Sequence, residues 1–434
     1  ILDEVVEKLG AAAKWRFGLG VERFSRSLAE LGSRLILRRG PAMDILRTLV
    51  AATGASCVVW SRAYDPAQIA RDKSVKAGLT ADGVEARSLP GHLLFEPWTV
   101  TTGSGGFYKV YSPMWKAVRD RDLDAPLPTP SRLPVPASWP ASDALNDWSM
   151  GADMNRGAAI VANHVCVGEA VAKDRLDAFI EDRIGDYADK RDFPGQTGTS
   201  RLSENMSYGE ISSLTCWHAG WRAVVEGKAG AETFLKELVW REFAYHLLYH
   251  TPHIAERNWR KDWDGFPWRD DNPDAERWRR GCTGIPFVDA GIREMYVTGT
   301  MHNRARMIVA SFLTKHLLTD WRVGQAWFED CLIDWDPASN AMGWQWAAGS
   351  GPDAAPYFRI FNPETQQKRF DPERTYVHRF IAEGQANPGP EALAFFDAVP
   401  RDWGMSRDGE YPAPMVDLAF GRRLALDAYA QHRG

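Results

Sequence analysis

The chain has 434 residues, which is enough for two or three domains, because a single hydrophobic core usually stops growing near about 250 to 300 residues. With 44% hydrophobic and 25% charged residues it has a globular composition, and no run approaches the roughly 18 apolar residues of a membrane span. The opening residues ILDEVVEKLG contain acids and no apolar core, so they are not a signal peptide and a cytoplasmic protein is expected. The net charge of -5 excludes a general attraction for nucleic acid, so DNA binding would need a local basic surface.

The cysteines are scattered, odd in number and never in a C-x-x-C pair. This pattern predicts free thiols in a reducing compartment and argues against a zinc or iron–sulfur site. The five residues concerned are Cys57, Cys166, Cys216, Cys282 and Cys331.

Residues 20–120 alternate between helical and extended patterns. Phe24, Leu28 and Leu31 recur at helical spacing, and DILRTLVAATGA (44–55) is again helical. SRLILRRG (33–40) is a short apolar run between charges and glycine, and SCVVW (56–60) is typical of a buried strand. Helices between short strands predict βαβ units with a parallel sheet, so we expect an α/β domain over residues 1–120.

The stretch PLPTPSRLPVPASWP (126–140) contains six prolines, which favours an extended connector and excludes a helix or a central strand. We expect this connector to occupy residues 121–195. The later segments, such as 231–250 and 289–297, are amphipathic with helical spacing and show no alternating strand pattern. Residues 196–434 are therefore predicted to form an all-helical domain.

The segment GTSRLSENMSYGEIS (198–212) places hydroxyls and a guanidinium ahead of a predicted helix, at Thr199, Ser200, Arg201 and Ser203. Such groups at a helix start suit a phosphate or a diphosphate. The ordinary alternative is that Ser and Thr here are only helix N-caps.

Two further segments put mixed polar and apolar groups on one helical face. Glu237, Trp240 and Arg241 stand at i, i+3 and i+4, and the alternative is a surface Glu–Arg pair beside a half-buried indole. In MHNRARM (301–307), Asn303 shares a face with Arg306 and Met307 while Arg304 points elsewhere. That face could address the edge of a heterocycle, or the helix could simply be capped and amphipathic.

Acids and tryptophans are concentrated in DCLIDWDPASNAMGWQWAAGSG (330–351). Asp334 and Asp336 lie close together and Asn340 follows, but no histidine is near, so we expect an ion pair with an arginine or hydrogen bonds to a ligand rather than a metal site. Trp344 and Trp346 are two residues apart, about 200° around a helix, so they cannot serve one surface.

The motifs GTSRLS, WREF, MHNRARMIVASF and DWDPASNAMGWQWAAGSGPDAAPYFRIFNP, in this order, resemble the DNA photolyase and cryptochrome family, most closely bacterial class I cyclobutane pyrimidine dimer photolyases. The resemblance covers essentially the whole chain. It implies a Rossmann-like antenna domain joined by a long linker to a helical FAD-binding domain. It also implies that excited, reduced FAD gives an electron to a dimer flipped out of the DNA, as enzymes of this class do.

The resemblance assigns roles by position, and it implies that Arg306 and Asp334 form an ion pair over the flavin ring. The matching FAD-binding residues are Tyr187, Thr199, Ser200, Arg201, Leu202, Ser203, Phe234, Glu237, Arg241, Asn303, Arg306, Asp334, Asp336 and Asn340. The residues that match catalytic positions are Glu237, Asn303 and Met307, and those that match the electron-transfer chain are Trp344, Trp321 and Trp268. The residues that match lesion and DNA contacts are Arg191, Trp240, Arg304, Trp346, Arg359 and Gln366.

Three features depart from the family pattern. The chain begins at ILDE, which resembles the end of a family strand, so the usual opening strand is missing from the pattern. TGSGGFYKVYSPMW (102–115) has glycines where folate-binding relatives have an acid, which leaves a deazaflavin antenna, a flavin antenna or none. Thr300 stands where the family commonly has Trp.

The expected partner is DNA that contains pyrimidine dimers. We expect the protein to be a monomer that does not associate with a membrane. The alternative on the same fold is a cryptochrome-like light sensor, for which a C-terminal extension would be expected, whereas this chain ends soon after PAPMVDLAFGRRLALDAYAQHRG. A 6-4 photolyase would carry a histidine pair where this chain has Asn303 and Met307.

Overall fold

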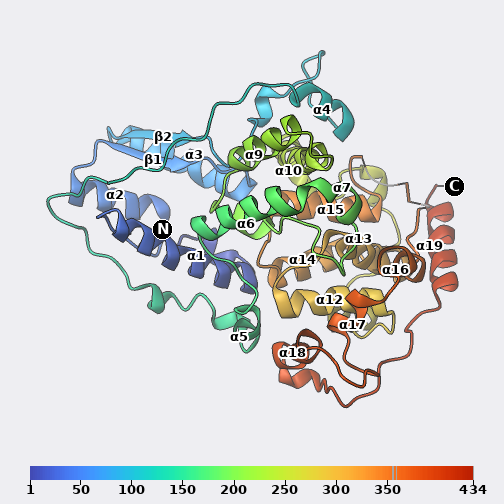
Figure 1. Cartoon of the computed structure of the whole chain (residues 1–434). Coiled ribbons are helices and arrows are strands. Elements are labelled where there is room, and N and C mark those ends of the chain that lie inside the picture. Colours follow the sequence, from blue (N-terminus) through green and yellow to red (C-terminus); the bar gives the residue numbers. More distant parts are fainter. Residues whose placement is uncertain (354–355, 358, 434) are drawn as a thin grey trace.

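The computed structural model of the chain describes residues 1–353, 356–357 and 359–433, arranged as Figure 1 shows. An α/β half lies beside a larger helical half, and a long connector runs around the α/β half. Within these ranges no helix is both long enough and apolar enough to cross a membrane.

The α/β half confirms the predicted parallel sheet, which has two strands. They pair in register from Cys57 opposite Glu85 to Ser61 opposite Leu89. The elements of this half are α1 (Ala11–Glu30), α2 (Ala42–Thr53), β1 (Cys57–Ser61), α3 (Pro66–Ala81) and β2 (Glu85–Leu89).

Two expectations for this half were wrong in part. The strand at 56–60 is not buried on both faces, because α2 and α3 cover only the face that carries Val58 and Trp60. Val59, on the opposite face, is 57% exposed. The apolar run 33–40 forms no strand, since its one ladder contact is an isolated bridge between Arg39 and Leu2.

The connector is extended as predicted, with no helix or strand between residues 121 and 144. It lies along the α/β half, where Leu133 N donates to Leu31 O at 3.2 Å and Leu37 N donates to Ser142 Oγ at 2.9 Å. Helix α4 (Tyr111–Val118) precedes the connector, and the part of the connector after residue 144 contains α5 (Gly157–Val161), α6 (Glu169–Asp182) and α7 (Tyr187–Lys190).

The helical half also confirms its prediction, because the described part of residues 196–434 contains helices and no strand. The predicted helix at 231–250 coincides with α10. These helices are α8 (Ser203–Ser207), α9 (Ser213–Val225), α10 (Ala231–His250), α11 (Pro273–Arg279), α12 (Pro286–Thr298), α13 (Asn303–Ser311), α14 (Trp321–Cys331), α15 (Pro337–Ala348), α16 (Pro363–Phe370), α17 (Thr375–Phe380), α18 (Pro390–Ala398) and α19 (Leu418–Arg433).

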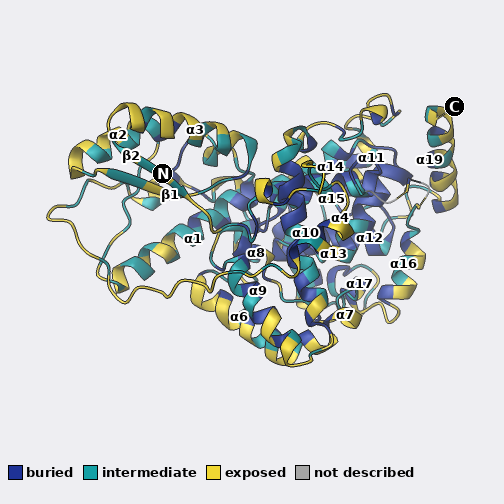
Figure 2. Cartoon of the chain, turned by 90° about the horizontal axis from the view of Figure 1, so that it is seen from above, coloured by how far each residue is buried: buried dark blue, intermediate teal, exposed yellow. Residues whose placement is uncertain are grey.

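Burial is concentrated in the helical half. Figure 2 shows buried residues gathered in α10 and α12–α15, while the outer faces of α2 and α3 are exposed. Helix α15 packs against both α10 and α13, so side chains from three separate segments of the sequence converge around it. All five cysteines are free thiols, as predicted.

Candidate functional site

The segment predicted to bind phosphate leaves its polar side chains without partners. Within the described ranges, the hydroxyls of Thr199, Ser200 and Ser203 make no hydrogen bond, and the Arg201 guanidinium has no acid within ion-pair distance. Ser203 begins α8, but no side chain caps that helix, so the N-cap alternative fails here. Burial lowers the pKa of Arg201; the charge of Glu294 opposes this effect, while Arg379 and Arg175 add to it. An anion would relieve this unfavourable charge, so the segment fits a phosphate group.

The predicted ion pair between Arg306 and Asp334 is present. Arg306 Nη2 lies 2.9 Å from Oδ1 and 2.8 Å from Oδ2 of Asp334, and Arg306 Nε donates to Met301 O at 2.7 Å. Asp334 is buried, so the arginine compensates a carboxylate that has little access to water. The ion pair therefore fixes the position of Asp334 just before α15.

Asp336 and Asn340 organise the start of α15. Asp336 Oδ1 accepts from Ser339 N at 2.7 Å, which makes it the N-cap, and its Oδ2 accepts from Tyr245 Oη at 2.8 Å. Asn340 Nδ2 donates to Asp336 O at 3.0 Å. Asp336 therefore acts through hydrogen bonds, whereas Asp334 acts through its ion pair with Arg306. The described residues contain no group of three or more potential metal ligands.

The three residues expected to share a face of α10 point to different partners. Glu237 pairs with Arg191, and although burial alone would lower the pKa of Arg191, the bond to Glu237 raises it. Arg241 is directed inward and donates to His92 O at 2.9 Å and to Ser213 Oγ at 3.0 Å. The expected common surface is therefore wrong for Arg241, because its guanidinium anchors the segment that follows β2.

Trp240 is held by an aromatic partner that was not predicted. Its ring stacks on Tyr111 of α4 at 3.8 Å between centroids and 5° between planes, and Tyr111 Oη donates to Lys236 O at 2.7 Å. Tyr111 covers one face of the indole, so a base could stack only on the opposite face. Its position more than 120 residues earlier in the chain gave no local signal.

Helices α13 and α15 carry two predicted catalytic residues and the tryptophan pair. Asn303 is exposed at the first turn of α13, and Met307 is half-buried one turn further on. Trp346 is half-buried and stacks on Phe361 at 6.4 Å. Trp344, in contrast, is only 2% exposed, which confirms that the two neighbouring tryptophans face different surroundings.

Trp344, Trp321 and Trp268 pack in or against one hydrophobic cluster. Trp321 Nε1 donates to Asn258 Oδ1 at 2.9 Å. Gly324 lies one turn after Trp321 on α14, and a Cβ there would lie 2.0 Å from Cη2 of Trp344. Gly324 therefore lets the Trp344 ring press against the same helix that carries Trp321.

The outermost of the three, Trp268, is half-buried and stacks on Trp263 with ring centroids 5.6 Å apart. Its Nε1 has no hydrogen-bond partner among the described residues.

Two of the arginines expected to contact DNA already form ion pairs with acidic side chains. Arg191 is paired with Glu237, and Arg304 Nη2 lies 2.5 Å from Asp192 Oδ2 while its guanidinium stacks on Phe370. Arg359 is exposed and has no acid partner in the described ranges.

The remaining predicted contacts occupy three settings. Gln366 is partly exposed on α16. Tyr187 and Phe234 are buried against each other at 6.2 Å, and Leu202 is buried at the start of α8.

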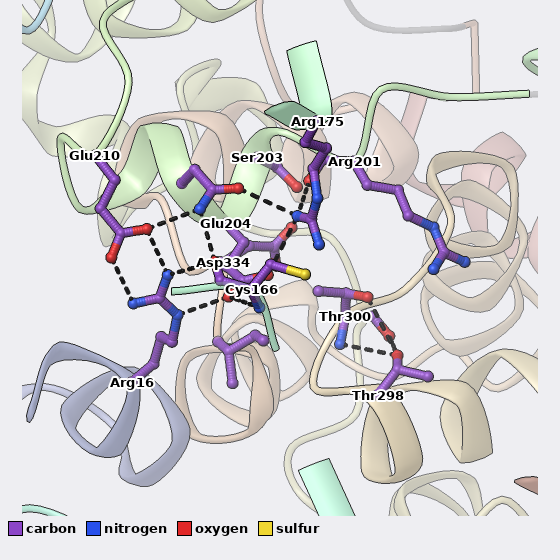
Figure 3. Close-up of polar contacts among 12 residues, drawn as sticks. Arg16, Cys166, Arg175, Arg201, Ser203, Glu204, Glu210, Thr298, Thr300 and Asp334 are labelled. Atoms are coloured by element: carbon purple, nitrogen blue, oxygen red, sulfur yellow. Dashed lines mark hydrogen bonds and ion pairs between the residues drawn. The ribbon is translucent and has the colours of Figure 1, made fainter. Parts of the chain in front are cut away.

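Thr300 forms part of a tight turn after α12. Gly299 ends the helix at φ 73°, and Thr300 N donates to Thr298 Oγ1 at 3.2 Å, as Figure 3 shows. The two hydroxyl oxygens are 3.1 Å apart. Hydrogen bonding within the turn therefore holds this backbone immediately before α13.

Two family models match the chain. One, described as the FAD binding domain of DNA photolyase, matches residues 234–431, and the other, described as DNA photolyase, matches residues 1–132. Their order agrees with the α/β half followed by the helical half. The chain belongs to the DNA photolyase and cryptochrome family.

The relatives are similar over almost the whole chain. Deoxyribodipyrimidine photo-lyase of Agrobacterium fabrum is 46% identical over 99% of this chain and 91% of its own length. The crystal structure of a bacterial class III photolyase from Agrobacterium tumefaciens has a TM-score of 0.90 at 44% identity and covers 100% of this chain and 91% of that chain. Cryptochrome-2 of Arabidopsis thaliana is 32% identical over 98% of this chain and 72% of its own length. The motifs most resemble class I enzymes whereas this solved relative is described as class III, so the comparisons show the family and not the class.

Proposed function

We propose that the chain is a deoxyribodipyrimidine photo-lyase that binds FAD and uses light to split cyclobutane pyrimidine dimers in DNA. The observation that carries the proposal is the phosphate-binding segment, whose hydroxyls and guanidinium lack partners, together with the Arg306–Asp334 pair. The identity to a photolyase, 46% over 99% of this chain, supports it. When bound, reduced FAD supplies the excited electron.

The proposed cofactor site uses two parts of the helical half. Thr199, Ser200, Arg201 and Ser203 hold the diphosphate, while Asn303 and the Arg306–Asp334 pair address the polar edge of the ring system. Asp336 and Asn340 fix the start of α15 and would contact the flavin beside this pair.

The proposed lesion site lies where α10, α13 and α15 converge. Glu237, oriented by Arg191, hydrogen-bonds the dimer, and Trp240 and Trp346 stack against its bases while Met307 packs beside it. Arg304, Arg359 and Gln366 contact the DNA backbone. Trp268, Trp321 and Trp344 pass an electron inward from the surface.

We assign residues 1–120 to the α/β domain, 121–195 to the connector and 196–434 to the FAD domain. The free cysteines support a place in the reducing cytoplasm, and we propose that the protein acts there as a monomer. An absorption spectrum of the purified protein tests the cofactor assignment, because flavin bands report FAD and an additional near-ultraviolet or violet band reports an antenna. Illumination of the reduced protein with dimer-containing DNA should remove dimers. Photoreduction without any dimer loss would favour a sensor instead.

Replacing Glu237 by alanine should lower the repair yield about tenfold while FAD stays bound, because a hydrogen bond to a charged group is lost. Dimer loss per absorbed photon and the flavin spectrum measure the two effects. Glu232→Ala is the matched control, since Glu232 lies on the same helix and, among the described residues, forms an ion pair with Lys236 alone, at the surface. An unchanged yield in Glu237→Ala would remove the carboxylate from the mechanism.

Replacing Trp268 by phenylalanine should slow photoreduction strongly, because phenylalanine is much harder to oxidise than tryptophan. Repair by protein that has first been reduced chemically should keep its wild-type yield. Trp98→Phe, in the α/β half and 44% exposed, controls for the general loss of an indole. If repair by pre-reduced protein fell as much as photoreduction, the separate roles would be wrong.

A further inference from the structure

A fully buried arginine of the α/β half reaches two acids of the helical half. Arg16 lies on α1 with its side chain 0% exposed. Its Nε is 2.7 Å from Glu204 Oε1, while Nη1 is 3.0 Å from Glu210 Oε1 and Nη2 is 2.7 Å from Glu210 Oε2 (Figure 3). One guanidinium therefore holds two carboxylates that are themselves almost without access to water.

The network continues to the backbone of the phosphate-binding segment. Glu204 Oε2 is 3.5 Å from Arg175 Nη1, and the same nitrogen donates to Arg201 O at 2.6 Å and to Asn205 Oδ1 at 3.1 Å. Asn205 Nδ2 in turn donates to Glu210 Oε2 at 2.7 Å. A continuous set of hydrogen bonds thus runs from α1 to the carbonyl of Arg201.

Arg201 needs this support because its backbone has φ 55°, a left-handed conformation that a non-glycine residue adopts only when its surroundings hold it. Figure 3 shows the Arg201 side chain extending away from the network, with no contact to Glu204 or Glu210. The charges of Arg16 and Arg175 balance those of Glu204 and Glu210. The Arg201 guanidinium is therefore not needed to neutralise these acids and can bind an anion.

A second contact joins α1 to the acid at the other end of the site. Tyr208 Oη lies 2.7 Å from Ile333 O and 3.2 Å from Ala13 O, and its ring lies under the Arg16 guanidinium at 4.9 Å. Ile333 directly precedes Asp334, the partner of Arg306. Helix α1 is therefore linked to the backbone beside two predicted flavin contacts, Arg201 and Asp334.

We infer that Arg16 is a positioning residue for FAD, so that α1 of the α/β half is part of the cofactor site. It acts through Glu204, Glu210 and Arg175 on the conformation of Arg201. The inference rests on the proposed function, since it names the residue that shapes the diphosphate contact. It requires that weakening the network should release FAD before it unfolds the protein.

Two mild variants test this with the holoprotein. Arg16→Lys keeps the charge, but an ammonium cannot reproduce the fork that reaches both acids, and Glu210→Gln removes the charge of one acid. Removing Arg16 altogether would leave Glu204 with only Arg175 and Glu210 with no cation among the described residues, so these variants preserve the fold better. Arg26→Lys is the matched control, because Arg26 lies on α1, is 65% exposed and, in the described part of the chain, forms an ion pair with Glu22 alone.

The measurements are the rate at which FAD separates from the holoprotein after dilution, amide hydrogen exchange over 199–207, and the urea midpoint of the apoprotein. Arg16→Lys and Glu210→Gln should each release FAD about tenfold faster, the loss expected for one charge-assisted hydrogen bond, and exchange faster over 199–207. Arg26→Lys should match the wild type.

If the variants lower only the urea midpoint and release FAD at the wild-type rate, Arg16 is merely structural and the inference is overturned. Wild-type protein that holds no FAD would overturn the proposed function as well. The FAD content of the wild type therefore tests the proposed function, and the FAD release rates of the variants test the role of Arg16.

Discussion

Replacing Gly324 by alanine is expected to lower the free energy of unfolding by about 3 kcal/mol and to slow photoreduction. The added Cβ would lie 2.0 Å from Cη2 and 2.4 Å from Cζ3 of Trp344, and 2.7 Å from Leu313 Cδ2. The indole is buried and its ring cannot yield without moving its neighbours, so the overlap must displace Trp344 or α14. Chemical denaturation measures the stability and flash photolysis measures the electron transfer.

Gly343→Ala provides the control for this prediction. Gly343 precedes Trp344 on α15, and a Cβ there would meet no atom within 4 Å. Alanine should stabilise this helix by about 1 kcal/mol, because glycine is the poorer helix former. Equal stability for the two variants would contradict the close approach of Trp344 to α14.

Replacing Lys315 by methionine is expected to stabilise the protein at pH 7 by about 3 kcal/mol. Lys315 is buried in a π-helical turn (Phe312–His316), where Nζ donates to Arg359 O at 3.2 Å and lies 5.0 Å from the Tyr357 ring centroid. No acid of the described ranges pairs with it, and burial lowers its pKa from 10.5 to about 7. At pH 7, where the folded lysine is half protonated, that difference corresponds to roughly 4 kcal/mol of lost stability, and the lost hydrogen bond offsets about 1 kcal/mol.

The pH dependence has a definite sign. The unfolded chain binds more protons at Lys315 than the folded chain does between about pH 7 and pH 10.5, so this group makes stability rise with pH in that window. Lys315→Met should remove that rise, and the gap between variant and wild type should narrow from pH 7 to pH 10. Lys236→Met, at a lysine whose side chain is 39% exposed on α10, should leave the wild-type slope intact. Parallel stability curves for wild type and Lys315→Met would show that burial does not perturb the lysine.

The sequence predicted what depends on local periodicity and missed what depends on distant partners. The helix at 231–250 was found because its apolar spacing is visible within one segment. The apolar run 33–40 was expected to be a strand, but a strand also needs a neighbouring strand, and here only Leu2 pairs with it. Local patterns carry no information on that pairing.

The same distinction applies to the site. The Arg306–Asp334 pair was predicted because the family motifs fix both residues. Arg241 was expected to share a surface with Glu237 because of their spacing. Its guanidinium instead points inward and donates to the carbonyl of His92. Arg16 gave no signal, since its partners Glu204 and Glu210 lie almost 200 residues further along the chain.

In the proposed lesion site, the stacking of Trp240 on Tyr111 would prepare the indole for a base before DNA arrives. Because the indole is already immobilised against a second ring, little of its rotational freedom remains to be lost when a base stacks on it. Helix α4, which supplies Tyr111, would thus set the shape of this stacking surface in the free protein.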